Sequence, residues 1–129
     1  MRVSVIAVFM AVMGLGIAWI WTRDIITAER LDISAGRLRG REPGAGSLLL
    51  PHWIAEFGTA GLLLMGSIGL LVEAGWGRSL SFVALGALVY TSTNSLGWAL
   101  AERERLPYAV PMVAGAAGGI AAIVGLFIL

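Results

Sequence analysis

The hydrophobic and polar positions along the chain divide it into four long, largely apolar runs joined by more polar segments. The runs cover about residues 3–21, 51–73, 80–101 and 107–129. Each is long enough for the roughly 20 residues that a helix needs to cross the hydrocarbon core of a bilayer. The pattern predicts an all-α integral membrane protein, with a single domain over 1–129 and four transmembrane helices in an antiparallel bundle.

The longest polar segment, residues 22–50, is expected to form a loop between the first two helices. It holds most of the charged residues and contains the turn-forming sequence REPGAGS at 41–47. The first run ends on Trp19 and Trp21 rather than on a small-residue cleavage site. A retained first helix is therefore expected, not a secretory signal peptide.

Composition supports the membrane class. The 129 residues are 58% hydrophobic and 13% charged, and the mean hydropathy is +0.87. A chain this apolar lacks the polar residues that would cover a soluble domain. It also contains no cysteine, so disulfides, thiol redox chemistry and thiolate metal sites are excluded.

The basic residues predict the orientation. All nine are arginine, and four crossings place residues 22–50 and 102–105 on the same side of the membrane. Seven arginines fall there, against two on the other side, Arg2 and Arg78. Because positively charged loops stay in the cytoplasm, we expect both termini on the non-cytoplasmic side of a cytoplasmic membrane. Most of the tryptophans, which favour membrane interfaces, fall at the predicted cytoplasmic helix ends: Trp19, Trp21, Trp53 and Trp98.

The second run carries the candidate polar site. His52 and Glu56 are four residues apart, so both side chains lie on one face of the helix. A carboxylate and an imidazole so placed can hold or pass a proton. The third run is antiparallel to the second, and its residues Asn94, Ser95 and Trp98 are expected in the same half of the membrane as Glu56. Tyr90, Asn94 and Trp98, at spacing four, form one polar and aromatic face that is expected to meet Glu56. A second interpretation leaves Glu56 at the interface, in contact with water or headgroups.

Small residues predict how the helices pack. Gly115 and Gly119 form a G-x-x-x-G pair in the fourth run, and Ala87 and Thr91 belong to a small-residue stripe in the third. Such residues let helix backbones approach closely within lipid. We expect packing inside the bundle, and we also consider the fourth helix as a surface for a second copy or another membrane protein.

Other chemistries are excluded or assigned to lipid. One histidine without cysteine gives no three-ligand zinc site, so no metal is expected, and no phosphate-binding motif or other cofactor signature is present. Arg37, Arg39 and Arg41 are predicted to contact lipid headgroups rather than nucleic acid.

These patterns favour a non-catalytic structural or accessory component of a membrane assembly. The second hypothesis is a small oligomeric transporter, or an ion or proton pathway, that uses Glu56. The third is a membrane enzyme that handles lipid or quinone, although no nucleophile and base are seen together in the sequence.

Overall fold

The computed structural model describes residues 2–34, 45–101 and 103–129, and it places side chains within 3–26, 51–101, 103 and 105–129. Every regular element of the described chain is helical. The elements are α1 (Arg2–Ser34), α2 (Ala45–Leu71), α3 (Gly77–Ala101), the short 3-10 helix η1 (Arg103–Tyr108) and α4 (Ala109–Ile128).

Three of the helical segments are long and apolar enough to cross a membrane: Val3–Ile26, Pro51–Leu71 and Arg105–Ile128. Helix α3 has a comparable length, but its centre is the polar sequence YTSTNS at 90–95. The predicted all-helical membrane protein is thus supported, with three spans identified by length and composition and α3 as a more polar fourth helix.

The first two helices extend past the limits expected from hydropathy. Helix α1 continues from the apolar run to Ser34, and α2 begins at Ala45. The sequence after Trp21 contains no proline or glycine before Gly36, so nothing stops the helix where the polar residues begin. Hydropathy marks where a helix leaves lipid, not where its hydrogen bonds end.

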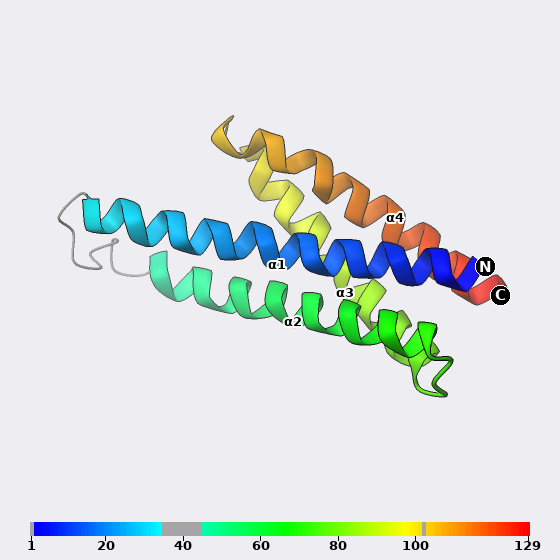
Figure 1. The fold of residues 1–129 in the computed structure, drawn as a ribbon. Coiled ribbons are helices and arrows are strands. Elements are labelled where there is room, and N and C mark those ends of the chain that lie inside the picture. Colours follow the sequence, from blue (N-terminus) through cyan, green and yellow to red (C-terminus); the bar gives the residue numbers. More distant parts are fainter. Residues whose placement is uncertain (1, 35–44, 102) are drawn as a thin grey trace.

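The helices form two antiparallel hairpins (Figure 1). Helix α1 runs along α2, α4 runs along α3, and α3 packs against both α2 and α4, whereas α1 and α4 touch at few points. The two chain termini lie at the same end of the molecule.

The turn between α2 and α3 brings two backbones into direct contact. Glu73 has a φ of 54°, and the amides of Glu73 and Ala74 bond to the carbonyls of Leu70 and Gly69 at 3.3 and 2.9 Å. This is the pattern of a left-handed C-terminal helix cap. A Cβ atom on Gly77 would collide with the backbone of Gly69, so only glycine allows this approach.

Side-chain hydrogen bonds to carbonyls add to the packing between helices. The Ser67 hydroxyl on α2 donates to the Ala7 carbonyl on α1 at 2.8 Å. The Arg78 guanidinium at the start of α3 donates to the Leu126 carbonyl near the end of α4. There it satisfies one of the carbonyls that a helix C-terminus leaves unpaired, and its charge is favoured by the helix dipole.

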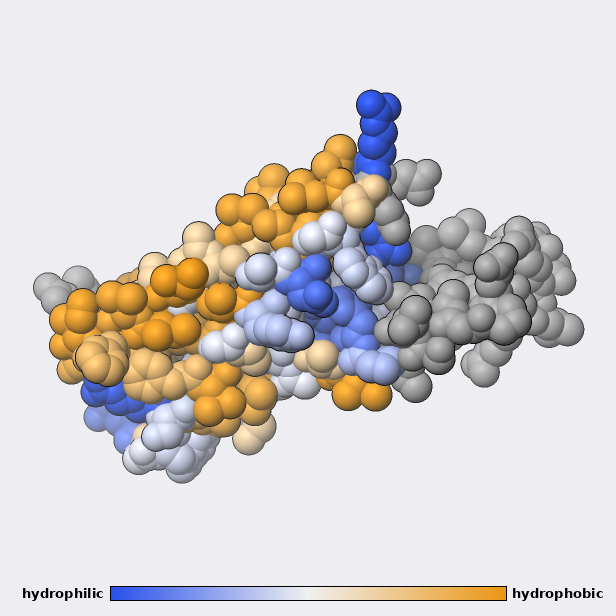
Figure 2. Space-filling model, turned by 180° about the vertical axis from the view of Figure 1, so that it is seen from behind, coloured by the Kyte–Doolittle hydropathy of each residue, from blue (hydrophilic) through white to orange (hydrophobic). Residues whose placement is uncertain are grey.

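The surface is apolar over much of its area, as expected of a protein surrounded by lipid. Helix α1 exposes a stripe of large side chains that includes Val8, Val12 and Leu15, and α4 exposes Phe127 and Ile128. Seen from the side opposite to Figure 1, apolar side chains cover most of one end, and hydrophilic ones gather near the middle of the face (Figure 2). Continuous apolar surface of this kind is rare on soluble monomers.

The glycine pair of α4 packs inside the chain. Gly115 and Gly119 are buried. A Cβ atom on Gly115 would collide with the Ser92 hydroxyl of α3 and approach the Met13 methyl of α1 to 3.0 Å, and one on Gly119 would lie 2.7 Å from the Val89 side chain. These glycines serve the contact between α3 and α4. Of the stripe on α3, Thr91 is buried and Ala87 is partly buried.

Gly115→Leu should therefore destabilise the monomer. Overpacking a tight contact costs about 1–3 kcal/mol, and here the neighbour is a helix that cannot move away freely. Ala117→Leu is the matched control, because Ala117 lies on the exposed face of the same helix. Thermal unfolding in mild detergent should show a lower midpoint for Gly115→Leu only, and equal midpoints would place Gly115 against lipid.

Candidate functional site

The Glu56 carboxyl group is enclosed by the helices. Only 2% of the residue is exposed, and the Ser95 hydroxyl on α3 donates a hydrogen bond of 2.8 Å to its Oε1 atom. The carboxyl group thus lies between α2 and α3 rather than at the lipid interface. Burying a carboxylate is costly unless polar partners compensate it, so this contact constrains how the two helices meet.

His52 lies one turn before Glu56 on the same face. Its Nε2 atom is 3.8 Å from Glu56 Oε1, and its side chain is 9% exposed. The imidazole stacks on the Trp98 ring of α3, with centroids 4.9 Å apart and planes at 17°. On its other side the Trp21 ring of α1 meets it edge-on, at 4.7 Å and 81°. The two tryptophans hold the imidazole beside the carboxyl group.

Trp21 brings the first helix into the site. It is buried, and its indole is a polar neighbour of the Glu56 carboxyl group, although its Nε1 atom makes no hydrogen bond of standard geometry. The His52 Nε2 and Trp53 Nε1 atoms are also buried without a hydrogen-bond partner. Unpaired buried nitrogens are uncommon in proteins, and an indole N–H group can only donate a hydrogen bond.

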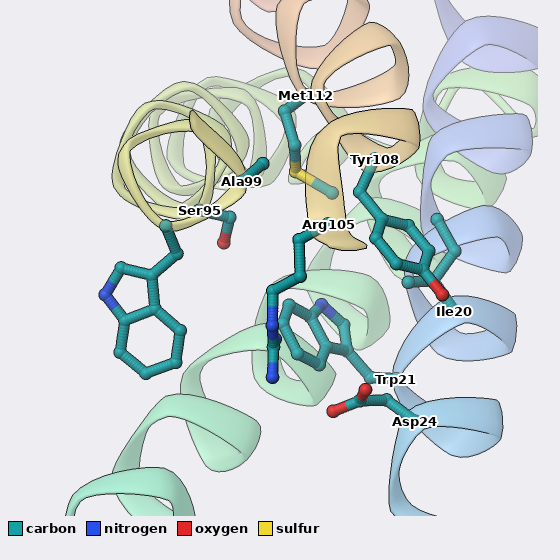
Figure 3. A pocket seen from close by; sticks show the side chains of 9 residues that line it. Ile20, Trp21, Asp24, Ser95, Ala99, Arg105, Tyr108 and Met112 are labelled. Carbon is teal, nitrogen blue, oxygen red and sulfur yellow. The ribbon is translucent and has the colours of Figure 1, made fainter. Parts of the chain in front are cut away.

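Two hollows adjoin this polar cluster. A cavity of about 190 Å³ lies between α1 and α4, and the polar side chains in its wall are those of Glu56 and Ser92. A smaller hollow of about 20 Å³ lies between Trp21, Ser95 and η1, with room for about one water molecule. Figure 3 shows Arg105 extending from η1 toward Trp21 and Asp24 at this smaller hollow.

The structure gathers four of the six predicted polar-site residues into one cluster: His52, Glu56, Ser95 and Trp98. The other two point elsewhere, since Tyr90 is 72% exposed and Asn94 is exposed as well. The expected contact between Glu56 and Asn94 is replaced by the bond from Ser95. Successive residues differ by about 100° around a helix, so a rotation of α3 by about that angle exchanges one neighbour for the other.

Trp21 was predicted only as a marker of the membrane interface and not as a site residue. Its position on α1 does carry a signal, because it continues the buried face of Met10, Gly14 and Ile17 at helical spacing. The predicted headgroup contacts Arg37, Arg39 and Arg41 lie outside the described residues.

Similarity to known proteins adds nothing to this geometry. No protein-family model, curated protein or solved structure matches the chain.

Within the described part of the chain, no three His, Asp or Glu side chains lie close enough to hold a metal ion. A buried carboxyl group beside an imidazole can pair with a cation, accept a hydrogen bond or exchange a proton.

Ser95→Ala should destabilise the protein, whereas Asn94→Ala should change little. Removing the donor leaves a buried carboxyl group short of a hydrogen bond, at a cost of about 1–3 kcal/mol, while Asn94 is exposed. The two residues are adjacent on α3, which makes them a matched pair for thermal unfolding in detergent. The reverse order of the two effects would mean that Asn94 is the partner of Glu56.

Proposed function

We propose that this chain is a non-catalytic, multi-pass protein of the cytoplasmic membrane, an accessory component that binds a ligand through Glu56. The ligand presents a cation or another hydrogen-bond donor to the carboxyl group. The observation that carries the proposal is a buried carboxyl group in the wall of a cavity between α1 and α4. Ionisable groups at membrane depth are costly, and they usually mark a binding site or an ion path.

The proposed threading uses all four helices. The polar centre of α3 is compatible with a span, because Thr91, Ser92 and Ser95 are buried. The exposed Thr93 hydroxyl donates to the Val89 carbonyl of its own helix at 2.7 Å, which lowers the cost of facing lipid. Both termini lie outside in this proposal, and the loop after α1 lies in the cytoplasm, as the arginine distribution favours.

The accessory role is supported by surfaces that one chain leaves uncovered. Tyr90 and Asn94 are exposed on α3, and amide groups facing lipid are unfavourable without a hydrogen-bond partner. The outer face of α4 exposes small residues, among them Ala114 and Ala117. A second copy or another membrane protein would cover these faces.

A proton or ion pathway is the second candidate. It is favoured by the distance of 3.8 Å between His52 Nε2 and Glu56 Oε1, which is too long for a hydrogen bond but suits a bridging water. Pairs of this kind can relay protons. Proton flux into vesicles that contain the protein, abolished by Glu56→Gln, would favour the pathway over the accessory role.

The threading predicts which sites an impermeant thiol reagent reaches in intact cells. A single cysteine at Ser79, an exposed residue in the first turn of α3, should be labelled. One at Ser34, at the end of α1, should be labelled only after the cells are opened. The chain has no native cysteine, so each signal comes from one site. The opposite pattern would reverse the orientation.

The binding proposal predicts that a small ammonium ion binds at Glu56. Butylammonium should change the tryptophan fluorescence of the detergent-purified protein in a saturable way, because Trp21 and Trp98 flank the site. Butanol, of similar size but uncharged, should bind at least about tenfold more weakly, a difference of about 1.4 kcal/mol.

Glu56→Gln should remove the saturable change, and Glu73→Gln should keep it because Glu73 is an exposed carboxylate in the turn. A response that is the same in Glu56→Gln and the unchanged protein would refute binding at this site.

A further inference from the structure

Two hollows lie between α1 and α4. Besides the cavity at Glu56, a groove of about 450 Å³ lies between the two helices nearer the chain termini. We call the cavity and the groove together the α1–α4 seam. On α1 its lining residues follow one helical face from Val5 through Phe9 and Gly16 to Ile20.

The seam is long, narrow and apolar. Fifteen residue steps from Val5 to Ile20 correspond to about 22 Å along the helix axis. This exceeds the roughly 15 Å that the lipid chains of one leaflet span. Glu56 and Ser92 lie in the wall of the cavity, whereas the groove is lined by apolar and small residues. One end of the seam is therefore polar and the rest is not.

The middle of the seam is closed by movable side chains rather than by backbone. A Cβ atom added to Gly115 would lie 3.0 Å from the Met13 methyl, and one added to Gly118 would lie 2.7 Å from the Phe9 ring. Methionine is flexible and adapts to irregular neighbours. A Cβ on Gly16, in the cavity wall, would meet no atom within 4 Å.

The size of the seam fits a slender molecule better than a helix. Its two parts, about 190 and 450 Å³, lie in the range of small-molecule sites. A partner helix about 10 Å across and 20 Å long would occupy on the order of 1,600 Å³. An extended hydrocarbon chain is the occupant whose shape matches.

We infer that the α1–α4 seam binds a single-chain cationic amphiphile, with its ammonium head at Glu56 and its hydrocarbon chain along the groove toward the chain termini. This inference rests on the proposed function, since it names the class of ligand for the same carboxyl group. Charge complementarity selects the head, because a buried carboxylate pairs with a cation and repels an anion. Ser92 supplies a second polar contact for the head.

The chain length of the ligand should then determine its affinity. With the protein in phosphatidylcholine nanodiscs, hexadecylamine should compete for the seam at least about a hundredfold better than butylamine, after correction for partition of each amine into protein-free nanodiscs. Palmitic acid, with the same chain and an anionic head, should not compete. The readout is crosslinking by a long-chain primary amine that carries a diazirine at the chain terminus.

The crosslinks should map to the groove, within the α4 stretch from Gly118 to Leu129, because the diazirine lies far from the head. Glu56→Gln should lower the yield about tenfold or more. Gly16→Leu should do the same by filling the cavity, and Ala121→Leu, in the groove, provides a second block. Gly61→Leu is the matched control, since a Cβ there also meets nothing within 4 Å but lies outside the seam.

The outcomes separate the two proposals. If butylamine binding depends on Glu56 while chain length and Gly16→Leu have no effect, the proposed function stands and the seam inference is wrong. If neither amine depends on Glu56, both are wrong. Crosslinks scattered over the exposed faces would also overturn the inference. So would crosslinks mainly to a second copy of the chain, because a neighbouring helix would then fill the seam.

Discussion

The enclosed carboxyl group of Glu56 is the feature on which the rest of the arrangement depends. The hydrocarbon core of a bilayer offers no hydrogen-bond partners, so the protein itself must supply those of a buried polar group. Ser95 of α3 supplies a hydrogen bond, the His52 imidazole of α2 lies 3.8 Å away, and Trp21 of α1 is a further polar neighbour. The hydrogen bond from Ser95 thereby constrains the mutual rotation of α2 and α3, because a turn of either helix would remove it.

The membrane environment also explains why the helices approach so closely elsewhere. Lipid tails are as apolar as leucine, so the hydrophobic effect does not hold helices together in a membrane. Close contact through small residues has to hold them together instead. The Ser67 hydroxyl reaches an α1 carbonyl, Gly77 lies directly against Gly69, and Gly115 leaves room for Ser92. The polar centre of α3 belongs to the same scheme, since its buried hydroxyl groups face the neighbours and the carboxyl group.

The sequence predicted which residues share a face of one helix and failed where two helices must be oriented. The shared face of His52 and Glu56 follows from their spacing, and it is present in the structure. The choice of Ser95 over Asn94 depends on the rotation of α3, which no pattern within α3 encodes. The role of Trp21 depends on packing between α1 and α2. The helical extensions to Ser34 and from Ala45 were missed. Hydropathy shows which residues favour lipid or water, and it does not show where the backbone hydrogen bonds of a helix end.

The membrane also determines how such a site can be selective. An apolar hollow in a soluble protein can stay empty at a cost in stability of about 24 cal/mol per Å³, but a hollow that opens to lipid is filled by lipid chains. A ligand chain that enters the α1–α4 seam therefore displaces lipid chains, and it gains free energy only where it fits the groove better than they do. Selectivity between ligands with the same chain must come from the head group, and the polar groups in the cavity wall are the carboxyl of Glu56 and the Ser92 hydroxyl. The same burial that makes this carboxylate costly to place would make its pairing with a cation strong, because the attraction between opposite charges is larger in a low dielectric.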